Sequence, residues 1–211
     1  MFTDESLSFQ WLPAEVPILS EFAGFVSHVD WDGNLYILAL ENNLDNLRII
    51  GTVLDSKYSD STPDPSDLQW SSGQACIALF SLDNKWYRGK VLEVKDTGEC
   101  LVEFVDYGSV ELCQPYNLRK ELFMTDLPVQ CYTVQMDIRP VGTKWEELVL
   151  NFLHKTVVEQ VMTVSIIQDR DNFPLFVKLV NKTGLDIAEL LINNGFGRRG
   201  HLKFEVIENH C

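Results

Sequence analysis

Between about residues 72 and 125 the sequence alternates short apolar stretches with tight polar turns, and this pattern constrains the fold more than any other feature. It predicts four strands, at residues 75–81, 85–94, 100–106 and 109–113. The connections Leu82-Asp83-Asn84 and Asp96-Thr97-Gly98 are short and rich in turn-forming residues. Four or five short strands cannot bury both faces of an open sheet, so we expect closure into a small barrel.

The segments on either side of this barrel are each incomplete. Before it, strands at 22–29 and 35–40 flank a turn containing Asp32-Gly33, and Leu44, Leu47, Ile50, Val53 and Leu54 form a helical stripe. A polar, proline-bearing stretch at 58–67 is typical of a linker. After the barrel, the pattern predicts strands at 130–136, 161–167 and 175–180 and helices at 145–154 and 185–194. A lone hairpin is marginal in water. The simplest arrangement therefore joins both outer parts into one domain, with the barrel inserted between them.

The charge of the chain restricts its partners. Lys and Arg number 17 against 31 Asp and Glu, for a net charge of −14, and residues 1–71 hold 12 of the acidic groups but 2 basic ones. Such an excess argues against a broad nucleic-acid or anionic-lipid surface and favours a cationic partner.

Targeting and metal signals are weak. The first residues lack the basic and apolar regions of a secretory signal, and no apolar run is long enough for a membrane span. Five cysteines without a CxxC pair indicate free thiols in a reducing compartment, cytosolic or nuclear. The four histidines lack metal-ligand spacing, so we expect neither a metal site nor a catalytic cluster.

Aromatic residues gather at the turns of the predicted barrel. Phe80 and Tyr87 flank the first turn, and Phe104 and Tyr107 straddle Asp106. Aromatic rings gathered at turns can form an open box that binds a methylated cation through the negative ring faces. The alternative is that these rings form the barrel core. Trp86 is expected in the core or behind the box.

The residues around these rings resemble a known family. Trp86-Tyr87-Arg88-Gly89-Lys90-Val91, followed by Val102-Glu103-Phe104-Val105-Asp106-Tyr107-Gly108, looks like the strand motifs of a Tudor domain. With the flanking elements, the resemblance extends to the extended Tudor domain and covers residues 17–204. It implies a mainly β fold with a few helices, in which a Tudor SH3-like barrel is inserted into a split staphylococcal-nuclease-like OB-fold. The implied organisation is an acidic N-terminal segment (1–16), the first OB-fold part (17–58), a linker (59–71), the Tudor barrel (72–125), the second OB-fold part (126–205) and a tail (206–211).

The resemblance also implies a function. Extended Tudor domains bind symmetrically dimethylated arginine in Arg-Gly or Arg-Ala repeats, often of PIWI proteins, without a cofactor. Their aromatic cage corresponds here to Phe80, Tyr87, Phe104 and Tyr107. The fifth position of the family is an asparagine that accepts a hydrogen bond from the guanidinium, and this chain has Ser109 there. Asp83 or Asn84 in the first turn is a candidate to compensate. The implied role is a non-catalytic scaffold of the piRNA pathway in cytoplasmic, perinuclear germ granules (nuage).

Three other hypotheses remain open at this stage. Nuclease activity would need acidic metal ligands and phosphate-clamping arginines, but Arg48 is the only arginine in the first 87 residues. RNA binding would rely on an OB-like face and on the basic cluster at 197–203, which more often is a solvated helix end. Finally, Ser109 stands where the family has an asparagine, so the cage could be vestigial. In that alternative the domain binds a protein partner through another surface.

Overall fold

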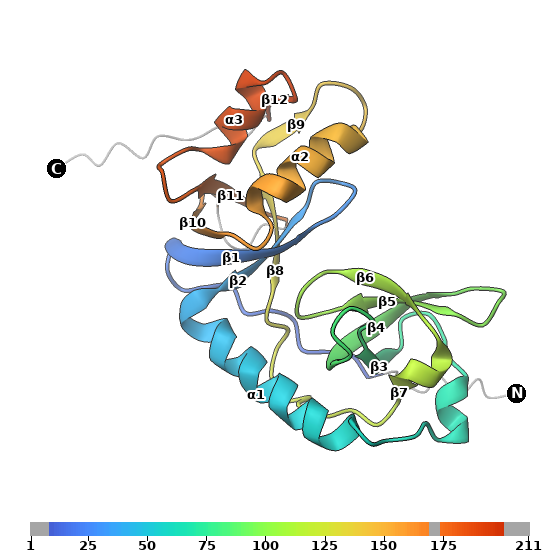
Figure 1. Ribbon diagram of the computed structural model, residues 1–211. Coiled ribbons are helices and arrows are strands. Elements are labelled where there is room, and N and C mark those ends of the chain that lie inside the picture. Colours follow the sequence, from blue (N-terminus) through green and yellow to red (C-terminus); the bar gives the residue numbers. More distant parts are fainter. Residues whose placement is uncertain (1–8, 169–173, 201–211) are drawn as a thin grey trace, which may run out of the picture.

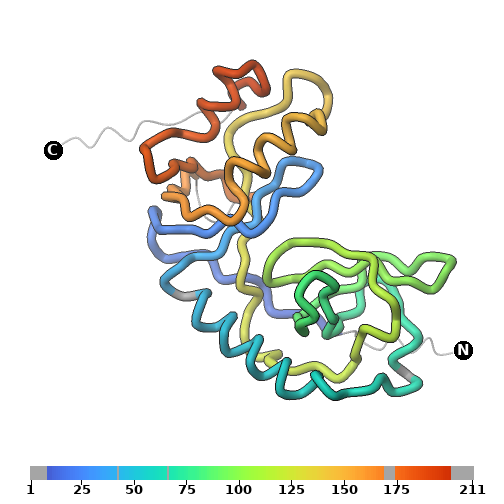
Figure 2. The backbone as a smooth tube through the Cα atoms, viewed as in Figure 1, coloured from blue at the N-terminus to red at the C-terminus, as the bar shows by residue number. Residues whose placement is uncertain are grey.

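The computed structural model describes residues 9–168 and 174–200, which fold into two β-domains side by side (Figure 1). The outer domain combines strands from both ends of the sequence. The inserted domain lies between them in the sequence, and the chain leaves and re-enters the outer domain along adjacent paths (Figure 2). The predicted split of one domain by another is therefore confirmed.

The outer domain is a barrel whose strands pair in a closed cycle, β1-β10-β11-β8-β2. These strands are β1 (Glu21–Val29), β2 (Leu35–Ala39), β8 (Tyr132–Met136), β10 (Val161–Ile166) and β11 (Leu175–Val180). The predicted turn between the first two strands is present: the Asp30 carboxylate accepts hydrogen bonds from the backbone N–H groups of Asp32 and Asn34, and Gly33 has φ +78°. Inward-facing Val, Leu, Ile and Met side chains fill the barrel core.

Two helices and a short ribbon complete the outer domain. The helices are α2 (Glu147–Val157) and α3 (Ile187–Asn193), and β9 (Ile138–Pro140) pairs with β12 (Gly197–Arg199). Both helices begin later than expected. For α3 the reason is Asp186, whose carboxylate accepts hydrogen bonds from the N–H groups of Ala188 and Glu189 and so caps the helix.

The helix α2 buries only part of its apolar residues. Leu148 is 66% exposed. The buried residues are Val149, Leu150, Leu153 and Val157. At about 100° per residue these four positions lie on one face, and Leu148 lies away from it.

The helix α1 (Leu40–Tyr58) connects the two domains (Figure 1). Its predicted apolar stripe is correct at Ile50 and Leu54, which are buried, and wrong at Leu44, which is exposed. The Tyr58 and Trp86 rings pack in a tilted arrangement with centroids 5.4 Å apart, and Trp86 is buried between the inserted sheet and the helix, so it is a core residue.

The inserted domain is a five-stranded sheet in the order β6-β5-β4-β3-β7. Its strands are β3 (Ala75–Leu79), β4 (Trp86–Val94), β5 (Cys100–Phe104), β6 (Val110–Cys113) and β7 (Leu118–Arg119). Cys113 of one edge strand and Leu118 of the other belong to the same buried cluster, so the sheet curls around one core. This closure into a small barrel, as expected, is by side-chain packing: within the described residues β6 and β7 do not pair, whereas the strands of the outer domain pair in a full cycle.

The predicted linker and the basic cluster are more ordered than expected. The stretch at 58–67 includes the start of a short 3₁₀ helix (Pro65–Leu68), and the Arg119 guanidinium binds the hydroxyl and carbonyl oxygens of Ser61. In the basic cluster, Gly197–Arg199 is a strand rather than a helix end. Residues 201–203 and the tail at 206–211 lie outside the described residues. Among the helices that the structure describes, none is long and apolar enough to cross a membrane.

Candidate functional site

The four predicted cage rings lie together at one end of the inserted domain. Phe80 follows β3, Tyr87 is in β4, Phe104 ends β5, and Tyr107 is in the turn before β6. The rings meet nearly edge to face: the Phe80 and Phe104 centroids are 4.9 Å apart, and the Tyr87 and Tyr107 centroids are 5.4 Å apart at 89°. Perpendicular rings of this kind form the walls of a box rather than a stack.

The rings divide between core and surface. Phe104 is buried in the core of the inserted domain, and Phe80 and Tyr87 are half-buried against it. Tyr107 is also half-buried. The core alternative therefore holds for Phe104, which also contributes to the lining of a cavity, and the cage assignment stays a prediction.

The turn between β3 and β4 supports Tyr87. The Asp83 carboxylate accepts hydrogen bonds from the Tyr87 hydroxyl, at 2.7 Å, and from the Lys85 N–H. Asn84 has φ +57°, a conformation that asparagine tolerates in tight turns. Asp83 and Asn84 are not among the described residues that line the cavity, so Asp83 acts on the Tyr87 ring rather than on the cavity itself.

The cage opens into a cavity of about 410 Å³ that both domains line. Ser109 lines it, and its hydroxyl has no hydrogen-bond partner among the described residues. The outer domain and the first turn contribute further lining residues that the sequence pattern does not predict. These are Phe25, Ser27, Leu82, His154, Val158 and Glu159. No local sequence signal identifies the outer-domain residues, because they reach the cavity only through the packing of the two domains.

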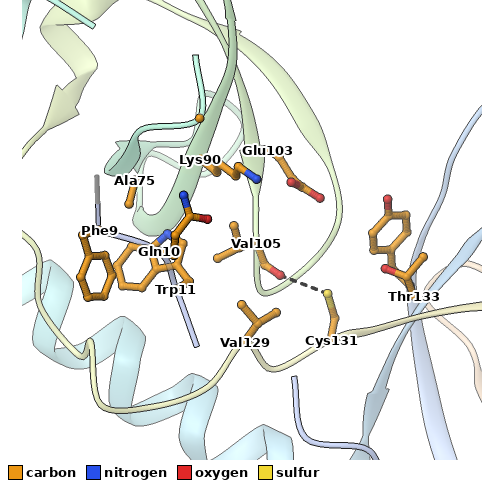
Figure 3. Close-up of a pocket in the computed structure, with 12 residues that line it drawn as sticks. Phe9, Gln10, Trp11, Ala75, Lys90, Glu103, Val105, Val129, Cys131 and Thr133 are labelled. Atoms are coloured by element: carbon orange, nitrogen blue, oxygen red, sulfur yellow. Dashed lines mark hydrogen bonds between the residues drawn. The ribbon is translucent and has the colours of Figure 1, made fainter. Parts of the chain in front are cut away.

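The turn that carries Tyr107 is attached to the outer domain at consecutive residues. The Val105 carbonyl accepts a hydrogen bond from the Cys131 thiol, a contact shown in Figure 3. The Tyr107 carbonyl accepts one from the Ser27 hydroxyl at 2.8 Å. A Cβ at Gly108, which has φ +80°, would overlap the Tyr36 ring. The outer domain thus fixes the backbone on both sides of the cage tyrosine.

A buried ion pair reinforces this attachment. Arg88 is fully buried, and its Nε donates to Asp106 Oδ2 at 2.8 Å. The same guanidinium donates to the carbonyl oxygens of Met124, Leu127 and Pro128, in the segment that returns to the outer domain. Asp106 also accepts the Gln130 N–H. The Arg and Asp of the two sequence motifs therefore connect the cage to the interface between domains.

The cage carries no charge of its own near neutral pH. Burial, with the nearby Asp106 charge, raises the pKa of Tyr107 to about 12. Burial and the hydrogen bond to Asp83 raise the pKa of Tyr87 still further. Neutral rings present negative faces, so the site is suited to a cation of low hydration. Glu159, which is exposed, adds a carboxylate at the rim.

Two further cavities lie along the interface. One of about 720 Å³ lies between the outer face of the inserted sheet, the β1–β2 turn and α2. The other, of about 200 Å³, lies under the N-terminal segment, where Trp11 donates a hydrogen bond to the Gly89 carbonyl. Figure 3 shows Lys90 and Glu103 of adjacent strands extending into it. Both cavities include Tyr36 and Glu103 in their lining, so they adjoin one another.

No group of three or more His, Cys, Asp or Glu residues is arranged to hold a metal ion in the parts of the chain at 9–168 and 174–200. The four described cysteines are free and buried, and burial raises the pKa of each thiol. Neutral buried thiols are poor nucleophiles and poor metal ligands.

Comparisons with known proteins agree with this geometry. Residues 16–138 match the family model described as Tudor domain. The chain is 28% identical to human Tudor domain-containing protein 1 over 181 residues, which is 83% of this chain and 15% of that protein. It is 26% identical to human RING finger protein 17 over 157 residues, 74% of this chain and 9% of that protein. The chain thus spans only a small part of the relatives it matches.

Solved structures show the same fold. The human TDRD1 extended Tudor domain, in complex with a symmetrically dimethylated E2F peptide, aligns with a TM-score of 0.78 and 23% identity, covering 90% of this chain and 95% of that one. Extended Tudor domain TD3 from mouse TDRD1, in complex with a MILI peptide containing dimethylarginine, aligns with a TM-score of 0.78 and 24% identity, covering 90% and 99%. The extended Tudor domain of Drosophila Tudor-SN aligns with a TM-score of 0.76 and 18% identity, covering 87% and 86%.

Proposed function

The chain belongs to the Tudor domain family, and on that basis we propose that it is a non-catalytic reader of dimethylated arginine in arginine-rich peptides. The observation that carries this proposal is the box of four nearly perpendicular rings, Phe80, Tyr87, Phe104 and Tyr107, opening into a cavity shared by both domains. Methyl groups replace water-binding N–H groups of the guanidinium, which lowers its desolvation cost while the positive charge remains for the ring faces.

Two residues offer hydrogen-bond acceptors for the guanidinium N–H groups of the ligand. Ser109 offers a hydroxyl acceptor on a shorter side chain than asparagine. Glu159 offers a carboxylate on the opposite, outer-domain side of the same cavity. A hydrogen bond to a charged group contributes about 1.5–3 kcal/mol, more than one between neutral groups. We therefore assign Glu159 as the acceptor that compensates for Ser109.

The partner that fits best is an arginine-rich segment of a PIWI-type protein. Support comes from the neighbours, whose structures contain dimethylated peptides of MILI and Piwi, although one holds an E2F peptide. The net charge of −14 favours a ligand with several cationic residues, since a negative surface speeds their encounter. A role as a scaffold in germ granules is part of the same proposal.

The test is isothermal titration with three forms of one Arg-Gly peptide: unmodified, asymmetrically dimethylated and symmetrically dimethylated. We expect the symmetric form to bind best. Tyr107→Ala should weaken its binding on the order of tenfold, because one ring contributes about 0.5–2 kcal/mol. Tyr116→Ala is the matched control, since Tyr116 is 60% exposed and outside the cavity lining.

Two more variants separate the acceptors. Glu159→Gln should reduce affinity, and Ser109→Asn should restore part of it in that background. Equal binding of the symmetric peptide by the original chain and Tyr107→Ala would refute the cage assignment. An unchanged affinity in Glu159→Gln would refute only the role of that carboxylate.

A further inference from the structure

The 720 Å³ cavity lies on the other side of the Tyr107 turn from the cage. Along this turn Tyr107 and Ser109 line the cage cavity, whereas Gly108 and Val110 line the larger one, which we call the groove. Consecutive residues of this segment thus line the two cavities in turn, so one chain segment separates the cage from the groove. His154, in the last turn of α2, lines both. A peptide that leaves the cage can therefore cross beside His154 and enter the groove.

One wall of the groove is the apolar outer face of the inserted sheet. Leu92 is 38% exposed and Val110 is 45% exposed, and the half-buried Leu101 lies between their strands. The register explains this exposure: Val102 points into the core and pairs with Glu111, so the neighbouring Leu101 and Val110 point outward. These aliphatic side chains face a cavity rather than another element of the chain.

The other wall carries the most exposed ring near the site. Trp31, at the tip of the β1–β2 turn, is 78% exposed and lines the same groove. The Asp30 carboxylate is occupied with turn N–H groups, which holds the tip in place. An exposed indole and exposed aliphatic side chains around one cavity mark a binding surface, since soluble proteins seldom leave such groups together without use.

The groove also carries negative charge. Asp30, Asp32 and Glu103 line it. Glu103 pairs in register with Lys90, but within the described residues it forms no ion pair. An apolar surface with an acidic rim matches a ligand in which an apolar side chain is flanked by cationic residues. Pure Arg-Gly repeats would leave the apolar wall uncovered.

We propose that the groove is a second subsite that binds one apolar side chain of the same peptide, on one side of the methylarginine in the cage. The inference rests on the proposed function and deepens it. A second subsite would make the chain selective among methylated peptides. The continuity of groove and cage through His154 and the acidic rim favour this occupant over a second copy of the chain.

The experiment is a leucine scan. Peptides with one symmetrically dimethylated arginine in a Gly-Ser-Lys background carry leucine at one position before or after it, and each is compared with its alanine counterpart by fluorescence anisotropy. We expect leucine on one side, at one or two adjacent positions, to raise affinity about tenfold, as partial burial of its side chain predicts. Trp31→Ala and Val110→Ser should remove that gain and leave the alanine peptides unaffected, and Tyr116→Ala should leave both unaffected.

The outcomes separate the two proposals. If no dimethylated peptide binds, or if Tyr107→Ala leaves the affinity for the peptide unchanged, the proposed function is refuted. If peptides bind through the cage but leucine gives no gain at any position, the second subsite alone is refuted. If Trp31→Ala instead abolishes self-association in sedimentation and leaves the leucine gain intact, the groove is an interface between copies, and the proposal is overturned.

Discussion

The two β-domains of this molecule enclose their cores in different ways. The outer barrel closes through hydrogen bonds around its whole circumference and buries an extensive aliphatic core. The inserted sheet closes only through side-chain packing and buries a small cluster with Phe104 at its edge. The inserted domain leaves Phe80, Tyr87 and Tyr107 only half-buried, and its buried cluster has fewer residues than that of the outer barrel.

The outer barrel stabilises the inserted domain through direct contacts. Hydrogen bonds from Ser27 and Cys131 and the packing of Tyr36 against Gly108 fix the turn that carries Tyr107. The outer barrel therefore supports the turn, and the inserted sheet carries most of the four rings.

Removing the buried charge at the interface should have the largest effect. Arg88→Met leaves Asp106 buried without its cationic partner and the Met124 and Leu127 carbonyl groups without the Arg88 donor, which costs about 3–5 kcal/mol of unfolding free energy. Lys95→Met is the matched control, because Lys95 and Glu93 form an exposed pair that contributes about 0–1 kcal/mol. Urea unfolding of both variants measures the difference. Equal losses would mean that Arg88 does not hold the domains together.

Gly108→Ala should have the next largest effect. Its positive φ costs about 1–3 kcal/mol with alanine, and the added methyl also collides with the Tyr36 ring of the other domain. Gly98→Ala has the same backbone strain, with φ +86°, but nothing within 4 Å of the new methyl group. The excess loss in Gly108→Ala measures the contact between domains, and it should be accompanied by weaker peptide binding. If both variants lose the same stability, the Tyr36 contact is unimportant.

The smallest effect should come from alkaline titration of one tyrosine in each domain. Burial raises the pKa of both Tyr36 and Tyr107 to about 12, against about 10 in an unfolded chain. Their contribution to stability is complete below about pH 10, and it is lost as the pH rises toward about 12, because the unfolded chain ionises first. Tyr36→Phe and Tyr107→Phe should each make the decline in unfolding free energy shallower over this range. A decline that is identical in all three proteins would contradict this.

Much of the fold was predictable from local sequence. The short strands between 72 and 125, the Asp32-Gly33 turn and the spacing of Phe80, Tyr87, Phe104 and Tyr107 follow from hydrophobic period and turn chemistry, which act over a few residues. The motif around Trp86 and Asp106 then identified the family, and with it the split of the outer domain.

Only the tertiary structure decided which surfaces meet. Glu159 and His154 reach the cage, and Trp31 reaches the groove, because the outer barrel packs against a turn far away in the sequence. The closure of the two sheets was likewise not encoded locally, since pairing of edge strands depends on how the whole sheet curls. The sequence by itself determined the strands, the turns and the four rings. Long-range packing between the two domains determined the shape of the cavity they line and the groove beside it, because neither exists until both domains are folded together.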